Sequence, residues 1–382
     1  MITQLTFQHE EQIMSILDKR SNFKPLAYPW AYEAFKTHEE MHWLPTEATA
    51  LPTDVGDYKN KLSDEERSLV TQILRFFTQT DIDVANGYTK VYMPQFNQPE
   101  LIMAMSSFAA REAVHVDAYS QVVETLGFGD GEYSRFLEYA EMRDKHEFLW
   151  DEPWKIFYGD PLFESGSTKY IPEDIVEGGR EAGFTDEAIE RIFNLTYSLA
   201  KFSGFAEGLQ LFSSFAMLLN FGRRGVMKGM SSIVAWSVRD ESLHVETMIK
   251  VFRELMKDFP WMNTPSFTDL INTLAQDMVK LENKFIDLAY RNEVTGNDIE
   301  LKGLTKEEIK GFVEVTANER LEQLGFKPIF KTTTNPIPWF NMMVAGVEHS
   351  NFFEERGTAY AKGMDSSKME FNFDGGFDNG MA

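Results

Sequence analysis

Apolar residues recur every three or four positions along most of the chain, and strand-like alternation of apolar and polar residues is hard to find. This spacing predicts α-helices, because residues three and four apart share one face of a helix. Two capping boxes, Ser63 to Glu66 and Thr305 to Glu308, mark helix starts. We expect long helices over residues 64–90, 98–126, 132–148, 187–221, 226–256, 266–291 and 306–323, with shorter ones near 10–18 and 29–41. The pattern therefore predicts an all-α bundle.

Two segments depart from this helical pattern. Residues 151–183 contain three prolines and several glycines, and so predict a connection between two helical groups. Residues 361–382 have the Gly, Asp and Ser content of a flexible tail, yet they also carry spaced phenylalanines. Such a tail is typical of a docking peptide. The alternative is a solvated tail that binds nothing.

Four of the expected helices place acids or histidines where the periodicity calls for apolar core residues. These residues are Asp81 on the first helix, Glu112 and His115 on the second, Glu207 on the third, and Glu241 and His244 on the fourth. Each isolated buried carboxylate costs several kcal/mol, so four of them need a counter-charge.

Two divalent cations would supply that counter-charge. Glu-x-x-His places both side chains on one face of a helix. Two such helices, with one carboxylate from each of two others, form the ligand plan of dinuclear carboxylate bundles. Oxygen-rich ligation with only two imidazoles favours iron or manganese over zinc or copper(I). The alternative is that the histidines pair with acids only for packing.

The remaining histidines lack such partners. A third Glu-x-x-His, Glu39 with His42, lies in a polar run and is interpreted as a surface coincidence. The others are interpreted as structural or surface residues: His9, His38, His146 and His349. The run HEEMH over residues 38–42 has the HExxH spacing, but it lies in the same polar run that is interpreted as a surface coincidence, so zinc protease chemistry is not supported.

Composition narrows the chemistry further. The chain contains no cysteine, which excludes a thiol nucleophile, a zinc-thiolate site and an iron–sulfur cluster within it. Its formal net charge of −23 disfavours binding to nucleic acid or to an anionic membrane surface. The first residues show no targeting signal, and the most apolar stretches, from Leu101 and from Phe212, are shorter than a membrane span. We therefore expect a soluble, cytoplasmic protein.

At these residues the chain resembles the small, radical-generating (beta) subunit of class I ribonucleotide reductase. The resemblance runs from about Tyr28 to Tyr360 and rests on the segments YPWAYEAF, HWLPTEA, RFFTQTDIDV, REAVHVDAY, GFAEGLQLF, VRDESLHVE and NFFEERGTAY. It implies a single ferritin-like helical domain over residues 1–360, a homodimer, and a tail over residues 361–382 that docks the large subunit. It also implies that the six residues above ligate a dinuclear metal centre. Two iron ions are expected first, with Mn/Mn or Mn/Fe as alternatives.

The resemblance also implies roles for residues around the metal ligands. Tyr119 stands at the position of the radical tyrosine, whereas a plain reading is a core tyrosine hydrogen-bonded to a ligand carboxylate. Asp240 and Trp43 match residues that carry an electron and a proton outward from His115, and Tyr360 matches the tyrosine that relays the radical onward. Ser237 lies one helical turn before Glu241 and faces the expected Tyr119 pocket, so a metal-centred oxidant is an alternative to a tyrosyl radical.

The function implied is that of a ribonucleoside-diphosphate reductase beta subunit, an oxidoreductase of deoxyribonucleotide biosynthesis that serves DNA replication. The chain would store a radical and pass it to a cysteine of the large subunit, where ribonucleotides are reduced. Two alternatives use the same scaffold. One is a dinuclear oxidase acting on a bound small molecule or lipid, and the other is a ferritin-like metal-storage bundle.

Overall fold

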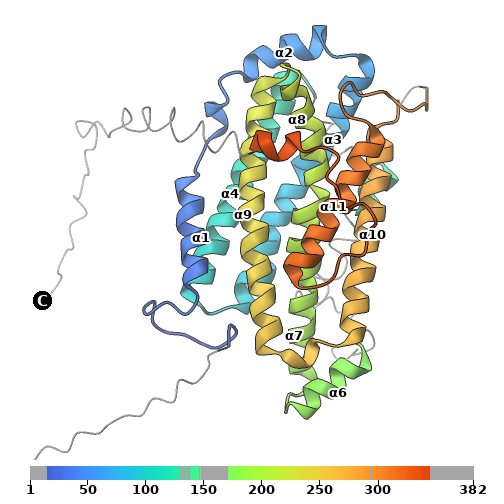
Figure 1. The fold of residues 1–382 in the computed structure, drawn as a ribbon. Coiled ribbons are helices and arrows are strands. Elements are labelled where there is room, and N and C mark those ends of the chain that lie inside the picture. The colour runs from blue at the N-terminus through green and yellow to red at the C-terminus, as the bar shows by residue number, and fades with distance from the viewer. Residues whose placement is uncertain are drawn as a thin grey trace, which may run out of the picture. The chain divides into compact units, whose positions relative to one another are not determined.

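The structure, a computed structural model, describes residues 15–129, 131, 135, 138–145, 147, 171–292 and 295–344. Within those ranges the fold is helical, and the β-structure there is limited to an isolated bridge between Arg291 and Asp298. The α-helices are α1 Pro29–Glu40, α2 Leu51–Asn60, α3 Asp64–Asn86, α4 Pro99–Leu126, α6 Glu173–Glu181, α7 Asp186–Leu199, α8 Phe212–Arg223, α9 Lys228–Asp258, α10 Pro265–Ala289 and α11 Lys306–Leu324 (Figure 1). Two π-helices, η2 Gly87–Tyr92 and η6 Ala200–Gln210, follow α3 and α7 directly. The all-α prediction is confirmed.

Both predicted capping boxes are present. The Ser63 hydroxyl accepts from the Glu66 amide at 3.2 Å, and the Glu66 carboxylate accepts from the Ser63 amide at 3.2 Å. Thr305 and Glu308 make the same reciprocal pair at the start of α11, at 3.1 and 2.8 Å. Each pair satisfies amides that a helix start leaves without partners, so the sequence located these two helix starts correctly.

Some elements differ from the prediction. Of the short helix expected near 10–18, residues 10–14 lie outside the described residues, and residues 15–18 form a turn. Helices α2 and α6 were not expected. The expected helix over 132–148 falls largely outside the described residues, although 140–145 are helical. The start of α9 also depends on a distant residue, because the Asp54 carboxylate accepts from the amides of Gly229 and Met230 at 3.1 and 2.7 Å. A Cβ at Gly229 would lie 2.2 Å from the Leu51 backbone, so the packing of α2 on α9 requires glycine there.

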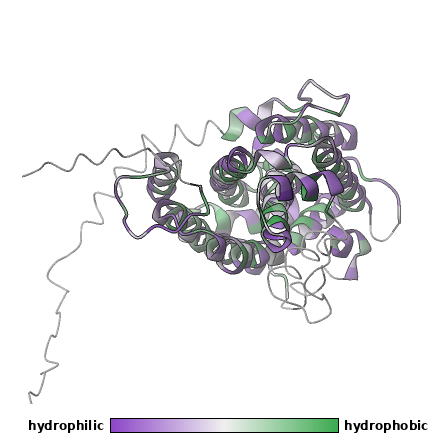
Figure 2. Cartoon of the chain, turned by 90° about the horizontal axis from the view of Figure 1, so that it is seen from below, coloured by the Kyte–Doolittle hydropathy of each residue, from purple (hydrophilic) through white to green (hydrophobic). Residues whose placement is uncertain are grey.

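The described residues up to Phe340 form one compact unit. In this unit α3 and α1 pack on α4, and α8 and η6 pack on α9, with the long helices running side by side (Figure 1). Seen from below, the helices carry hydrophilic and hydrophobic positions on different faces (Figure 2). The predicted boundary between residues 360 and 361 lies outside the described part of the chain and stays a prediction.

Residues Asp186–Arg223 form one continuous helical rod that is long and apolar enough to cross a membrane. Its apolar window is 100% buried inside the protein, as expected for the central helix of a bundle. The middle of this rod is the π-helix η6 rather than the regular α-helix that the periodicity predicts. π-helical turns within a longer helix are frequent at functional sites.

Candidate metal centre

The six residues that the periodicity singled out come together inside the bundle. They lie on α3, α4, η6 and α9, and each has at most 3% of its surface exposed. The six are Asp81, Glu112, His115, Glu207, Glu241 and His244. Four carboxylates and two imidazoles thus share one buried volume, drawn from segments up to 163 residues apart in the chain, from position 81 to position 244.

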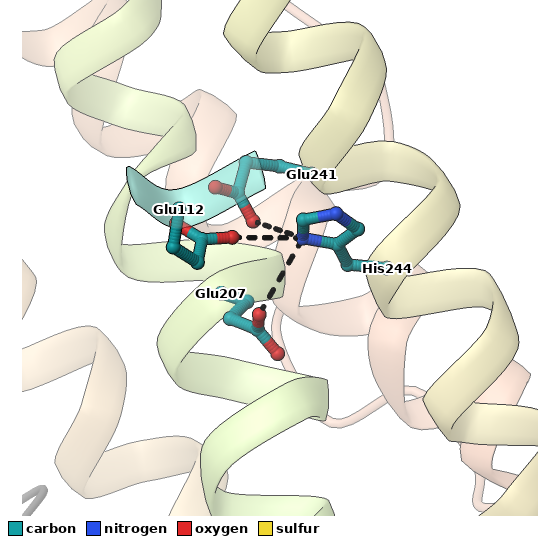
Figure 3. Close-up of side chains that lie close together, drawn as sticks. All are labelled: Glu112, Glu207, Glu241 and His244. Carbon is teal, nitrogen blue, oxygen red and sulfur yellow. Dashed lines mark ion pairs between the residues drawn. The ribbon is translucent and has the colours of Figure 1, made fainter. Parts of the chain in front are cut away.

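One group surrounds the Nδ1 atom of His244 (Figure 3). Glu112 Oε1 lies 3.1 Å from this nitrogen, Glu241 Oε2 lies 3.3 Å away, and Glu207 Oε1 lies 3.8 Å away. The three carboxylates come from three different helical segments and converge on one side of the imidazole. Such an arrangement suits a cation held by one nitrogen and several oxygens.

A second group contains Asp81, Glu112 and His115, whose ligand atoms lie within 4.8 Å of one another. Glu112 belongs to both groups, so its two oxygens face two adjacent positions. His115 Nδ1 lies 3.2 Å from Glu112 Oε2 and 3.4 Å from Glu241 Oε1. The residues are therefore compatible with a dinuclear site in which Glu112 lies between the two positions.

Polar atoms without hydrogen bonds provide a test of this fit. Among the described residues, buried atoms with no hydrogen-bond partner include Asp81 Oδ2, Glu112 Oε1, Glu207 Oε2, Glu241 Oε2 and His244 Nδ1. Buried polar atoms in native proteins are otherwise nearly always paired. These five atoms all belong to the cluster, and Glu112 Oε1 and Glu241 Oε2 have only the charge of His244 Nδ1 as a partner, at 3.1 and 3.3 Å, so the residues present fit a pair of metal ions.

The electrostatics of the protein alone point the same way. Burial, followed by the charge of Glu112, raises the pKa of Asp81 well above its usual value. Burial and Glu241 likewise raise the pKa of Glu207. Burial alone would lower the pKa of His244, but Glu112 and Glu241 raise it to about 10. The cluster therefore takes up protons because it lacks positive charge, which divalent cations would supply.

The far nitrogen of His115 faces Asp240. His115 Nε2 lies 3.2 Å from Asp240 Oδ2, and the Trp43 indole donates to the same oxygen at 2.7 Å. Arg111 donates to Asp240 as well, at 3.0 Å. Burial alone would raise the pKa of Asp240, but His115 and Arg111 hold it below its usual range. Three of the four residues of the expected relay, His115, Asp240 and Trp43, are thus in direct contact, with Trp43 2% exposed.

The far nitrogen of His244 faces His38, a residue that the sequence analysis did not assign to the site. His244 Nε2 lies 3.0 Å from His38 Nε2, and His38 is fully buried on α1. Burial and the charge of His244 lower the pKa of His38 to about 2, so its ring is neutral. Our interpretation of His38 as a structural or surface residue overlooked a signal, since Ala31, Ala34 and His38 share one helical face.

Tyr88 is a second contact that was missed. Its hydroxyl donates to Glu207 Oε1 at 2.7 Å, and its side chain is fully buried. Tyr88 belongs to the apolar stripe of the first helix, but nothing in that stripe indicated a partner on η6. The bond leaves Glu207 Oε2 as the oxygen without a hydrogen bond, so Tyr88 fixes which way this carboxylate faces.

Tyr119 is buried beside the cluster and does not bond a carboxylate of it. Its hydroxyl donates to Ser237 Oγ at 3.0 Å, and Ser237 in turn donates to the Ile233 carbonyl at 3.1 Å. The Phe77 ring packs against Tyr119 with centroids 4.9 Å apart. Burial, and then the charge of Asp81, raises the pKa of Tyr119, which keeps the phenol protonated.

The other predicted residues are either outside the cluster or outside the described part of the chain. Glu39 and His42 are both exposed, which agrees with their interpretation as a surface pair, although Glu39 accepts a hydrogen bond from Ser107. Tyr360 and the tail fall outside the described residues, as do His9, His146 and His349.

A small cavity adjoins Glu207 between α3 and η6, with room for about one water molecule.

Comparisons with known proteins identify the family. The family described as "Ribonucleotide reductase, small chain" matches residues 20–336. A probable ribonucleoside-diphosphate reductase small subunit of Invertebrate iridescent virus 6 is 40% identical over 366 residues, which is 91% of this chain and 96% of that protein. The ribonucleoside-diphosphate reductase subunit beta of Chlamydia pneumoniae is 26% identical and covers 88% of each chain.

Solved structures agree on the fold. The ribonucleotide reductase R2 subunit from Clostridium botulinum matches with a TM-score of 0.69 and 19% identity, covering 90% of this chain and 99% of that one. The Streptococcus sanguinis dimanganese(II)-NrdF matches with a TM-score of 0.59 and 18% identity, covering 86% and 99%. Since the family match spans most of the chain and the viral relative is 40% identical, this chain belongs to the ribonucleotide reductase small-chain family.

Proposed function

We propose that this chain generates and stores the radical of a ribonucleoside-diphosphate reductase and works with a separate large subunit that reduces ribonucleotides. The observation that carries the proposal is the buried cluster of four carboxylates and two imidazoles, in which five polar atoms lack hydrogen bonds. Family membership supports the same function. An oxidoreductase of this kind needs a sheltered site for a strong oxidant, and this cluster is sheltered from solvent.

Six residues would hold the metal pair: Asp81, Glu112, His115, Glu207, Glu241 and His244. Two redox-active ions bound there and oxidised by an oxygen species would supply a strong one-electron oxidant. We propose iron first, with a manganese pair or a mixed pair as alternatives, because carboxylates with two imidazoles suit both metals. The relative from Streptococcus sanguinis, which shares the fold, is described with two manganese ions.

Tyr119 is the residue that we propose stores the oxidising equivalent. The hydroxyl is protonated in its resting state and donates to Ser237, so losing an electron requires losing that proton as well. Phe77 packs on Tyr119 and makes a tilted contact with Phe215 at 5.1 Å, and Tyr119 is only 1% exposed to water. Water exclusion protects an oxidised side chain from reduction by solutes.

The hydrogen-bonded contacts of His115, Asp240 and Trp43 support the proposed route for transfer outward. Tyr360 would relay the radical to a cysteine of the large subunit, and residues 361–382 would dock that subunit. We also propose a homodimer and a cytoplasmic location.

Paramagnetic resonance tests the proposal. Protein loaded with iron, with manganese or with both, and then oxidised, should show a tyrosyl or high-valent dinuclear signal at two metal ions per chain. Tyr119→Phe should remove a tyrosyl signal and leave metal content unchanged. Tyr360→Phe should keep the stored radical and lose turnover with the large subunit. Activity of protein that binds no metal would exclude the proposal.

A further inference from the structure

The two imidazoles of the cluster have different hydrogen-bond partners at the nitrogen that faces away from the carboxylates. His115 directs Nδ1 at the carboxylates and Nε2 at Asp240, whereas His244 directs Nδ1 at the carboxylates and Nε2 at His38. A carboxylate such as Asp240 accepts a hydrogen bond and so fixes the tautomer of its histidine. A second imidazole is ambiguous, because a neutral ring can donate or accept through either nitrogen.

The contacts beyond His38 remove that ambiguity. His38 Nδ1 lies 2.7 Å from Ser107 Oγ, and the Ser107 hydroxyl donates to Glu39 Oε1 at 2.5 Å. A serine has one hydrogen to donate, and here the carboxylate takes it. Ser107 must therefore accept from His38 Nδ1, which leaves the Nε2 lone pair of His38 to accept from His244.

The Glu39 carboxylate, at the outer end of this series of hydrogen bonds, thus fixes the direction in which each bond is donated. Glu39 is exposed at the surface on α1, Ser107 is 7% exposed on α4, and His38 and His244 are fully buried. His244 donates to His38, His38 donates to Ser107, and Ser107 donates to Glu39, which only accepts. With its Nε2 hydrogen committed to His38, a neutral His244 keeps its Nδ1 lone pair facing Glu112 and Glu241, the side on which a metal ion would bind.

We infer that His38 is a positioning residue for the metal centre: with Ser107 and Glu39 it holds His244 in the tautomer and orientation that present Nδ1 to a divalent cation. This inference rests on the proposed function only in taking His244 as a ligand. Losing a partner that orients a ligand histidine weakens metal binding by about 10- to 100-fold. The loss should fall on the ion held by His244, because His115 has its own partner in Asp240.

Titration of the metal-free protein with Mn²⁺, followed by the resonance signal of the free ion, tests the inference. Wild-type protein should bind two ions per chain. His38→Leu should weaken one of the two by about 10- to 100-fold and leave the other unchanged. Ser107→Ala should weaken the same ion by a smaller factor, because it removes the acceptor that fixes the His38 tautomer.

His38→Gln is the informative rescue variant. Its amide oxygen can accept from His244 and its amide nitrogen can donate to Ser107, so two tight ions should return. His42→Leu, which changes an exposed histidine just after the same helix, is the matched control and should bind as wild type does. The Tm of each metal-free variant reports folding independently.

The possible failures are distinguishable. Wild-type protein that binds fewer than two ions would contradict the proposed function itself. Two tight ions in wild type, His38→Leu and Ser107→Ala alike would overturn the positioning of His244 by His38 and leave the proposed function intact. If His38→Leu does not fold, Ser107→Ala and His38→Gln still decide the matter, since unchanged affinity in Ser107→Ala or a weakened ion in His38→Gln would contradict the inferred direction of the chain.

Discussion

The Trp43 indole donates a hydrogen bond of 2.7 Å to Asp240 Oδ2, the oxygen that also lies 3.2 Å from the imidazole of His115. One carboxylate oxygen thus joins a residue on the loop after α1 to a histidine on α4, and Asp240 itself belongs to α9. The bond has a structural consequence and, under the proposed function, a functional one. The two can be separated by changing each partner in turn.

Asp240→Asn should destabilise the metal-free protein by about 3–5 kcal/mol, because it leaves the buried guanidinium of Arg111 without its counter-charge. Trp43→Phe removes one hydrogen bond and a larger ring from the same contact, and leaves the Arg111 ion pair intact. Trp43→Phe should therefore lower the free energy of unfolding by less than Asp240→Asn does. We expect about 1–3 kcal/mol, the cost of leaving a buried acceptor without one of its partners. Urea denaturation of the two variants measures both values.

Turnover measures the functional consequence. If Trp43 relays the radical, Trp43→Phe keeps metal content and the stored radical but fails to support reduction by the large subunit. A Trp43→Phe protein with wild-type turnover would remove Trp43 from the route. Trp236, whose ring lies 5.1 Å from that of Trp43, provides the control, since Trp236→Phe changes a neighbouring aromatic residue outside the His115–Asp240 contact.

Ser237→Ala should leave the Tyr119 hydroxyl buried without an acceptor. An unsatisfied buried hydroxyl costs about 1–3 kcal/mol, so the free energy of unfolding should fall by this amount. Ser237→Thr keeps a hydroxyl at the same place and should lose less. If a tyrosyl radical forms, the wild-type signal should show a hydrogen bond to the phenoxyl oxygen that Ser237→Ala lacks, measured by high-field paramagnetic resonance. Identical spectra would mean that Ser237 does not contact the radical.

The residues of the cluster could be predicted because each one is a charged or polar residue within the apolar face of its own helix. Asp81, for example, interrupts an apolar stripe of α3, and a helix shows its buried face through its own periodicity. The approximate bounds of the long helices followed from the same signal and from the caps, whereas the short helices α2 and α6 were missed. Periodicity shows which face of each helix is buried, but it does not show which helices are neighbours. The contacts of the six residues with one another therefore could not be predicted.

The residues behind the cluster could not be predicted, because their significance depends on which helices touch. His38 lies close to His244 only because α1 packs against α4 and α9. Tyr88 lies on η2 and Glu207 on η6, and the 3.6-residue period of an α-helix does not describe where side chains lie on these two π-helices. Gly204 and Gly208 within η6 lower its α-helical propensity, but they do not by themselves indicate a π-helix.

The metal-free protein should lose stability as the pH rises from about 7 to about 9. The folded protein raises the pKa of His244 from 6.5 to about 10, so it keeps a proton there that the unfolded chain has already lost. The stabilisation is complete below pH 6.5 and disappears as the pH approaches 10. Each such proton contributes about 1.4 kcal/mol per pH unit. His115, whose pKa is also raised, adds to the slope.

Metal binding should reverse this dependence. A divalent cation displaces the proton from His244, so metal affinity should rise with pH over the same range and binding should release protons. Calorimetric titration with Mn²⁺ in two buffers of different ionisation enthalpy counts the protons released. A metal-loaded protein should show a much flatter stability profile, and a profile as steep as that of the metal-free protein would contradict the assignment of His244 to the site.

A second buried ion pair, outside the cluster, should also be critical for stability. Lys145 Nζ lies 2.6 Å from Glu282 Oε2, and both side chains are fully buried. The ammonium also donates to the Gln210 carbonyl at 3.0 Å and lies 3.9 Å from the centre of the Phe76 ring. Gln210 is the last residue of η6, so Lys145 ties α10 to the end of the segment that carries Glu207.

Lys145→Met should destabilise the protein by about 3–5 kcal/mol, because it leaves the Glu282 carboxylate buried without a positive partner. Glu282→Gln in the same background removes that uncompensated charge and should recover part of the loss, with Ser213 still donating to the amide oxygen. Unfolding of the single and double variants in urea measures the coupling between the two residues. If Lys145→Met and the double variant lose the same free energy of unfolding, Lys145 stabilises the fold through Gln210 and Phe76 rather than through Glu282.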